Sequence, residues 1–107
     1  MRVISQNGTM DFSYEISTIF IYPRVENVIA IQSAGDSEIS IIARYSSKEK
    51  ALKAMEMLRR AYENNMFYHC MANTKRFEEA QSILSVEQFR KATAEYFQFP
   101  QDEDIEA

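Results

Sequence analysis

The pattern of hydrophobic residues changes near residue 46, and this change constrains the fold more than any other feature. Before it, turn-forming residues separate five short apolar runs, at 2–6, 9–12, 16–22, 27–33 and 38–45. After it, apolar residues recur mostly three and four positions apart. Short apolar runs bounded by turns indicate strands, whereas the longer spacing indicates amphipathic helices. The sequence therefore predicts a β-rich first half and a helical second half.

The first two runs flank Asn7-Gly8, a dipeptide that favours a tight hairpin turn because it tolerates positive φ. Pro23 ends the third run, and Ala34-Gly35-Asp36 supplies the turn before the fifth. Short connections favour antiparallel neighbours. We therefore expect an antiparallel β meander of about five to six strands, led by the Asn-Gly hairpin and with residues 66–72 as a further strand.

Helical signals begin at Ser46, an N-cap residue with Glu49 three positions on. Asn64-Asn65 is a plausible helix end, and further helices are expected at about 74–84 and 85–97. The inward stripe of the first helix is predicted to comprise Ala51, Leu52, Met55, Leu58 and Tyr62. The prediction is an α+β fold in which the meander packs on two to three helices. Residues 1–100 form one domain, and 101–107 form a solvated acidic tail.

Apolar residues occupy both faces of the predicted strands. Ile16, Thr18 and Phe20 share one face of their strand, while Ile19 and Ile21 share the other. An antiparallel sheet with one wet face alternates more cleanly than this. Either helices on both sides or a second subunit covers the second face. Because few helices are available, we favour a second subunit and expect a homo-oligomer.

Composition narrows the class of protein. The chain has 107 residues, of which 46% are hydrophobic and 26% charged, which is typical of one globular domain. Its 12 basic residues face 16 acidic ones, a balance that argues against general nucleic-acid binding. No segment resembles a signal peptide or a membrane helix. We expect a cytoplasmic protein that does not engage membranes.

The residues that usually carry catalysis are scarce. His69 is the only histidine and Cys70 the only cysteine, and on a strand such neighbours point to opposite faces. Cys70 is more often a buried small hydrophobe than a reactive thiol. Two glycines in the whole chain leave no phosphate-cradling glycine loop. We therefore expect no enzyme activity, no metal site and no cofactor.

Basic residues lie in three small groups. At the predicted end of the first helix, Arg59-Arg60 would favourably meet the helix dipole. Positive charge is disfavoured at a helix start, so Lys75-Arg76 points to a compensating anion or acidic neighbour. Together with Arg90-Lys91 and aromatic residues such as Phe67, these basic residues could line the floor of a pocket that binds a phosphorylated base. For any single residue, a solvated surface is the simpler interpretation.

Several short motifs are distinctive: the opening Met-Arg-Val-Ile-Ser-Gln-Asn-Gly followed by Asp11 and Tyr14-Glu15, then Ala43-Arg-Tyr-Ser46, the helical segment 50–57 and the ending at 97–106. Together they resemble those of a family of small proteins encoded by phages and mobile elements of Firmicutes. The resemblance spans most of the chain. These motifs carry no chemistry of their own.

Size, a β-rich start and a helical end are also similar to the first type of Thoeris anti-defence sponge. That resemblance implies an oligomer that binds a cyclic ADP-ribose-type signal or a cyclic oligonucleotide and sequesters it without cleavage. Arginines, an aromatic residue and an asparagine surround the ligand in that family. Residues of those types here are Phe67, Asn73, Arg76 and Arg90. The alternative is a protein-binding inhibitor of a bacterial defence system, similar to an anti-CRISPR protein.

Overall fold

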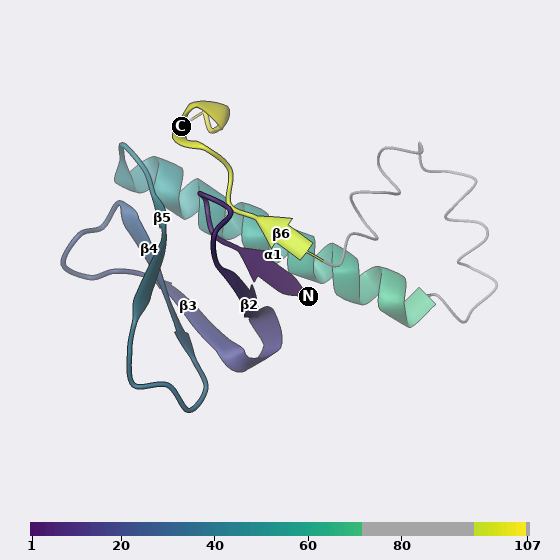
Figure 1. The fold of residues 1–107 in the computed structure, drawn as a ribbon. Coiled ribbons are helices and arrows are strands. Elements are labelled where there is room, and N and C mark those ends of the chain that lie inside the picture. Colours follow the sequence, from purple (N-terminus) through teal and green to yellow (C-terminus); the bar gives the residue numbers. More distant parts are fainter. Residues whose placement is uncertain (72–95, 107) are drawn as a thin grey trace.

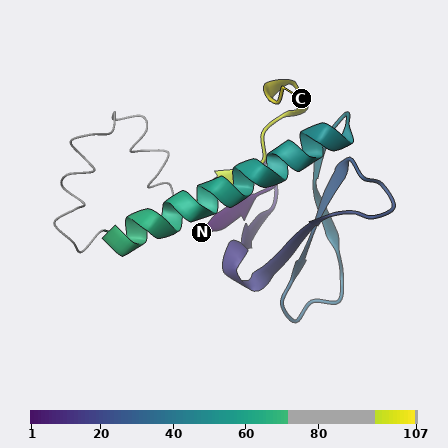
Figure 2. The same ribbon diagram turned by 180° about the vertical axis from the view of Figure 1, so that it is seen from behind.

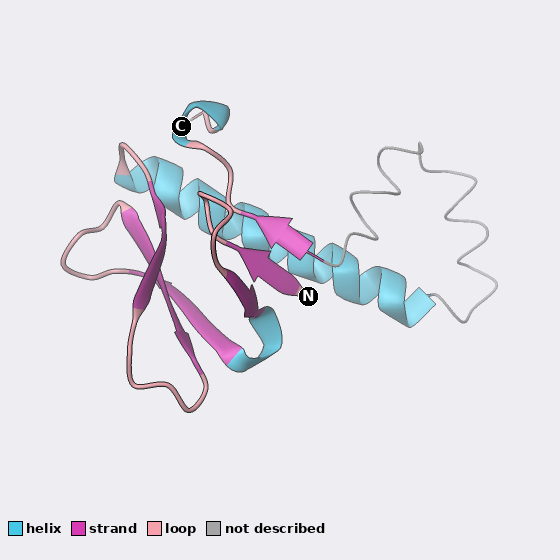
Figure 3. Ribbon diagram, in the orientation of Figure 1, coloured by secondary structure: helices cyan, strands magenta, loops and turns pink. Residues whose placement is uncertain are grey.

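The computed structural model describes residues 1–71 and 96–106, with only the backbone described for 68–71. The described strands are β1 (Arg2–Ile4), β2 (Asp11–Ser13), β3 (Ser17–Ile21), β4 (Val28–Ser33), β5 (Ser40–Arg44) and β6 (Tyr96–Gln98). One long helix, α1 (Lys48–Met71), follows β5. Short helical turns η1 (Tyr14–Ile16) and η2 (Asp102–Asp104) complete the described elements (Figure 3). The fold is α+β, as predicted.

The strands form two small sheets instead of the single expected meander. One sheet has the order β2-β1-β6 and the other the order β3-β4-β5. All neighbours are antiparallel except β1 and β6, which run parallel. Helix α1 lies across one side of both sheets, as Figure 1 and the rear view in Figure 2 show. β6, near the end of the chain, therefore belongs to the same sheet as β1, near its beginning.

The Asn-Gly hairpin forms, but its turn differs from the expected type I′. Only Gly8 has positive φ, at 75°, whereas Asn7 does not. The Gly8 N–H donates to the Ser5 carbonyl, and the Asn7 side chain accepts from Ser5 Oγ and from Thr9 N and Oγ1. Because the Asn7 side chain holds the loop, a four-residue connection replaces the two-residue turn.

Helix α1 differs from the prediction at both ends. Ser47 is the N-cap, since its Oγ accepts from the Lys50 N–H at 3.2 Å. The helix also continues through Asn64 and Asn65 to Met71, so the predicted strand at 66–72 is wrong. Asn65 is buried and there is no glycine to stop the helix. A short apolar run fits either a strand or a helix, and here the preceding helix simply extends.

The last predicted helix is also corrected at its end. Tyr96–Gln98 forms β6, which pairs with β1 through Val3 opposite Phe97. Tyr96, which was expected to face inward on a helix, is exposed. The parallel pairing comes from a contact between the two ends of the chain, and local periodicity does not reveal such a contact. Residues 72–95, with most of the second and third predicted helices, lie outside the described residues.

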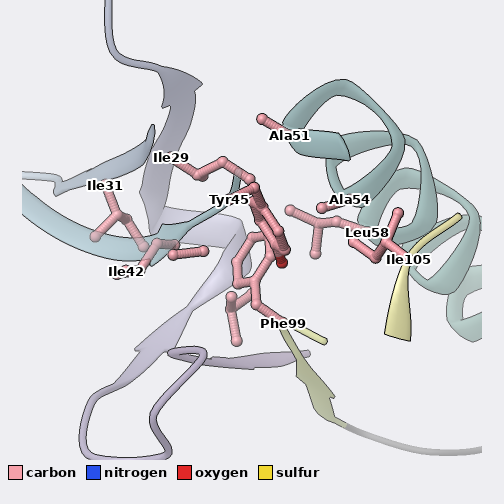
Figure 4. Close-up of a cluster of buried hydrophobic side chains, with 11 residues drawn as sticks. Ile29, Ile31, Ile42, Tyr45, Ala51, Ala54, Leu58, Phe99 and Ile105 are labelled. Carbon is pink, nitrogen blue, oxygen red and sulfur yellow. The ribbon is translucent and has the colours of Figure 1, made fainter. Parts of the chain in front are cut away.

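One hydrophobic cluster joins the two sheets to the helix. Figure 4 shows Tyr45 and Phe99 between the strands and α1. The helix contributes Ala51, Ala54 and Leu58, while Leu52, predicted to face inward, is exposed. The small alanines allow close approach of the helix to the strands. The packed stripe is thus rotated slightly from the one predicted from the larger side chains.

A β-bulge accounts for part of the imperfect alternation in β5. The register with β4 shifts between Ile29 and Ala30, so Ile41 lies opposite Ala30 while Ala43 lies opposite Ile29. Ile42 is the extra residue, and both Ile42 and Ala43 are buried in the cluster while Ile41 is exposed. Because a bulge sets two successive side chains on one face, the inner face gains an extra isoleucine.

The acidic ending is only partly solvated. Glu103, Asp104 and Glu106 are exposed, but Ile105 is 4% exposed and packs in the core cluster. Asp102 accepts from the Ser46 N–H at 2.7 Å, and Lys50 Nζ donates to the Asp102 carbonyl at 2.8 Å. The segment 102–106 is therefore held by hydrogen bonds at the start of α1.

Asp102 gives the fold a specific pH dependence. The Ser46 N–H, followed by Lys50, lowers the pKa of the Asp102 carboxyl below its ordinary value. This carboxylate contributes stability above its unfolded pKa of about 3.9, and the contribution is lost as pH falls through the lower folded value. Asp102→Asn is expected to lower the urea midpoint at pH 7 and to weaken the acid loss of stability below pH 4. Asp104→Asn is the matched control, and an equal effect there would contradict the assignment.

Gln6 connects three parts of the molecule. Its N–H donates to the Ile42 carbonyl, and its Oε1 accepts from the Arg44 N–H. These two bonds satisfy backbone groups on the outer edge of β5, the edge that does not pair with β4. Gln6 Nε2 donates to the Pro100 carbonyl at 3.2 Å, and its own carbonyl accepts from Gln101 Nε2 at 2.7 Å. Every polar group of this residue is therefore used.

Replacing Gln6 by alanine should destabilise the fold more than an ordinary surface change. Gln6→Ala removes two hydrogen bonds and leaves the Arg44 N–H and the Pro100 carbonyl without these partners. We expect a loss of about 1–3 kcal/mol in the free energy of unfolding, measured by urea denaturation. Gln98→Ala, on exposed β6, is the matched control, with an expected change within about 0.5 kcal/mol. Equal effects of the two variants would refute the role of Gln6.

Candidate functional site

Of the four predicted ligand-binding residues, the structure describes one. Phe67 lies on α1 with 55% of its side chain exposed. Helical spacing places it on the side of α1 away from Ala51, Ala54 and Leu58. Asn73, Arg76 and Arg90 lie outside the described residues, so their grouping with Phe67 stays a prediction.

A pair of stacked tyrosines lies where η1 meets α1. The ring centroids of Tyr14 and Tyr62 are 4.2 Å apart, with 29° between the ring planes. Tyr14 is positioned by the turn of η1 and by its N–H, which donates to the Met1 carbonyl. Tyr62 follows Leu58 by one helical turn and is half-buried. The pair joins the first hairpin to the middle of the helix.

Charged groups surround this pair. Burial is the main cause that raises the pKa of Tyr14, and the neighbouring Tyr62 adds to it. Arg59 lies close enough to oppose this shift, while Glu15 and Glu63 reinforce it. The N-terminal amine pairs with Glu15 and lowers the pKa of that carboxyl. The Tyr14 phenol therefore remains neutral beside the exposed guanidinium of Arg59.

Arg59, Tyr14, Tyr62 and Met66 define a surface that we call the helix flank. Arg59, Tyr62 and Met66 follow one another at helical spacing, and Met66 is exposed. Within the described part of the chain, Arg59 makes no ion pair, whereas its neighbour Arg60 pairs with Glu56 at 2.6 Å. A guanidinium beside aromatic rings can bind a phosphate and support a stacked base.

Among the described residues, two open grooves are lined by residues other than those of the helix flank. The larger, about 490 Å³, includes Glu15, Thr18, Gln32 and Asp36 in its lining. Its two carboxylates make it a poor receptor for a phosphate. The smaller, about 290 Å³, lies beside Gln6 and Arg44. The hydrogen bonds of Gln6 already occupy much of the polar backbone there.

The interpretation of His69 and Cys70 changes with the helix. Both belong to α1 instead of a strand, so the expectation of opposite faces, which depended on a strand, does not apply. Within residues 1–71 and 96–106, no three His, Cys, Asp or Glu residues come together as metal ligands. No helix in that part of the chain is long and apolar enough to span a membrane.

Sequence reasoning missed the helix flank for a definite reason. Arg59 was assigned to a helix end, but α1 continues for twelve residues beyond it to Met71. Tyr14 begins η1, directly after the first hairpin. The contact of Tyr14 with Tyr62 joins residues 48 positions apart, and no local sequence pattern indicates such a contact. The spacing of Arg59, Tyr62 and Met66 was the one available signal.

The comparisons with known proteins found no relative of this chain. No family model matches it, and neither a curated protein nor a solved structure matches it. The assignment of function therefore receives no support from these comparisons.

The stacking of Tyr14 on Tyr62 should be measurable as a coupling energy. In a double-mutant cycle of Tyr14→Leu and Tyr62→Leu, we expect a coupling of about 0.5–1.5 kcal/mol in the free energy of unfolding. The Tyr14→Leu and Tyr22→Leu pair is the control, with coupling near zero. Additive effects of the first pair would show that the rings do not stabilise each other.

Proposed function

We propose that this protein binds a cyclic nucleotide immune signal and sequesters it without cleavage. The ligand is of the cyclic ADP-ribose type or is a cyclic oligonucleotide. In this proposal the protein is a phage-encoded anti-defence factor that acts as a homo-oligomer in the bacterial cytoplasm and is not an enzyme. The proposal follows the resemblance of the sequence to such sponges, and one observation in the structure supports it.

That observation is the exposed Arg59 beside the stacked Tyr14–Tyr62 pair. A cyclic nucleotide combines negative phosphates with flat bases, so its receptor needs cations next to aromatic surfaces. Phe67 lies eight residues beyond Arg59, roughly 12 Å along the helix axis. The helix flank and Phe67 therefore offer groups of the required kinds over the length of a dinucleotide. Asn73, Arg76 and Arg90 complete the proposed binding set.

A second candidate is a protein-binding inhibitor of a defence system. Leu52, Met57, Met66 and Phe67 are all exposed along α1, and they lie on more than one side of the helix. Exposed apolar side chains on a long helix are groups that a protein partner contacts when it docks on a helix. The same measurements separate the two candidates.

The test is a calorimetric titration with cyclic ADP-ribose isomers and cyclic di- and trinucleotides. We expect micromolar or tighter binding of at least one of them. The bound compound, released by heat, should have an unchanged mass. Release of a hydrolysed product would instead identify an enzyme. Failure to bind any member of the panel would contradict the sponge and leave the protein-binding candidate.

Variants then locate the ligand. Arg59→Gln is expected to weaken binding about tenfold or more, because one charge-assisted contact to phosphate is lost. Arg60→Gln is the matched control, since Arg60 already pairs with Glu56. Phe67→Ala should weaken binding by a similar factor, because stacking contributes about 1–3 kcal/mol per base. Unchanged affinity in both Arg59→Gln and Phe67→Ala would exclude this face of α1 as the receptor.

A further inference from the structure

The first strand of the antiparallel sheet has an open edge. Among the described strands, β3 pairs with β4 alone. Tyr22 N–H donates to the Val28 carbonyl, and Ala34 N–H donates to the Ile16 carbonyl. Alternate residues of an antiparallel strand point their backbone groups to opposite sides, so those of Ile19 and Ile21 point away from β4. Among the described residues these outward groups have no hydrogen-bond partner.

This edge lacks the protection that the opposite edge of the same sheet has. β5 carries a bulge, and Gln6 occupies its outer backbone groups at Ile42 and Arg44. β3 has five residues, Ser-Thr-Ile-Phe-Ile, with no charge, no proline and no bulge. Proteins usually guard an exposed edge with such devices, because an open edge pairs with other strands. An unguarded edge of this length is typical of a strand that pairs in the assembled protein.

We propose that β3 pairs with β3 of a second copy of this chain, antiparallel about Ile19, to form a continuous six-stranded sheet. A two-fold axis at Ile19 lets the two Ile19 residues exchange both backbone hydrogen bonds. Thr18 then lies opposite Phe20 of the second copy, which is a favourable β-branched and aromatic pair. Ser17 lies opposite Ile21 of the second copy. No like charges meet within the paired strands.

The charges at the two ends of β3 fit this arrangement. Glu15 precedes the strand and Arg24 follows it, and both side chains are exposed. Antiparallel pairing about Ile19 brings the Arg24 end of one copy to the Glu15 end of the other. Asp36 lies in the same groove as Glu15, so a guanidinium arriving there would meet two carboxylates. A parallel arrangement would instead place like charges together.

This inference deepens the oligomeric part of the proposed function and does not depend on the ligand. The mass of the protein is measured first, without nucleotide, by size exclusion with light scattering. We expect about 25 kDa, twice the 12.5 kDa of one chain. A monomer at all concentrations up to hundreds of micromolar overturns the proposal, whatever the nucleotide titrations show.

Amide exchange in the wild-type protein tests the location. The Ile19 and Ile21 amides have no partner within the described chain, so they exchange quickly in a monomer. In the proposed dimer both are protected, and the protection rises with protein concentration. Fast exchange of both amides in a sample that is dimeric by mass places the contact elsewhere and overturns the proposal.

Charge variants test the register. Thr18 and Phe20 lie on the outer face of β3 and outside the core cluster. Thr18→Lys with Phe20→Lys puts lysine opposite lysine twice, and we expect at least a hundredfold weaker dimer. Thr18→Lys with Phe20→Glu puts opposite charges together, and dimerisation is expected to return. The control, Gln98→Lys with Asn64→Lys, adds the same charge at exposed positions on β6 and α1, away from β3, and should leave the dimer unchanged.

Circular dichroism and thermal unfolding show whether each variant folds. A folded double-lysine variant that dimerises as tightly as the wild type overturns the proposal. So does a folded lysine–glutamate variant that stays monomeric while the double-lysine variant is also monomeric. If the double-lysine variant fails to fold, amide exchange of Ile19 and Ile21 in the wild-type protein decides alone.

Discussion

The hydrogen bonds of Gln6 hold the two sheets and the end of the chain in one arrangement. Its backbone N–H and side-chain oxygen cover the outer edge of β5, and its side-chain nitrogen and carbonyl engage Pro100 and Gln101. Tyr45 reinforces this junction, because its hydroxyl donates to the same Pro100 carbonyl at 2.9 Å. Without these bonds, the Ile42 carbonyl and the Arg44 N–H on the outer edge of β5 would lose these partners. The placement of Phe99 and Ile105 in the core follows from them.

The two edges of the antiparallel sheet differ, because described residues outside the sheet hydrogen-bond to the backbone of only one of them. β5 receives Gln6 and a bulge, and the bulge turns Ile42 and Ala43 together into the core. β3 receives neither, although it is apolar on both sides. The apolar surface that the sequence showed on two faces therefore has two separate causes. Part of it is the effect of the bulge on β5, and part is Phe20 on the outer face of β3.

Helix α1 connects the fold to the proposed binding surface. Its alanines and Leu58 face the strands, so the flank that carries Arg59 and Tyr62 is held in a fixed relation to η1. A binding group on such a helix costs little entropy to order when a ligand arrives. Arg60, one residue further round the helix, already pairs with Glu56. This difference between adjacent arginines makes Arg59 the better candidate for an external anion.

The sequence by itself determined the α+β class, the first five strands, the opening hairpin and the existence of the long helix. These features depend on residues close in the chain, such as Asn7-Gly8 and the spacing of Ala51 and Leu58. Only the tertiary structure decided the pairing of β6 with β1, the contacts of Gln6 and the stack of Tyr14 on Tyr62. Each of these joins residues tens of positions apart, and their free energy comes from burial and hydrogen bonds made after the chain closes. The helix passing through Asn65 shows the same limit at short range, because a buried polar residue looks like a helix end until its surroundings are known.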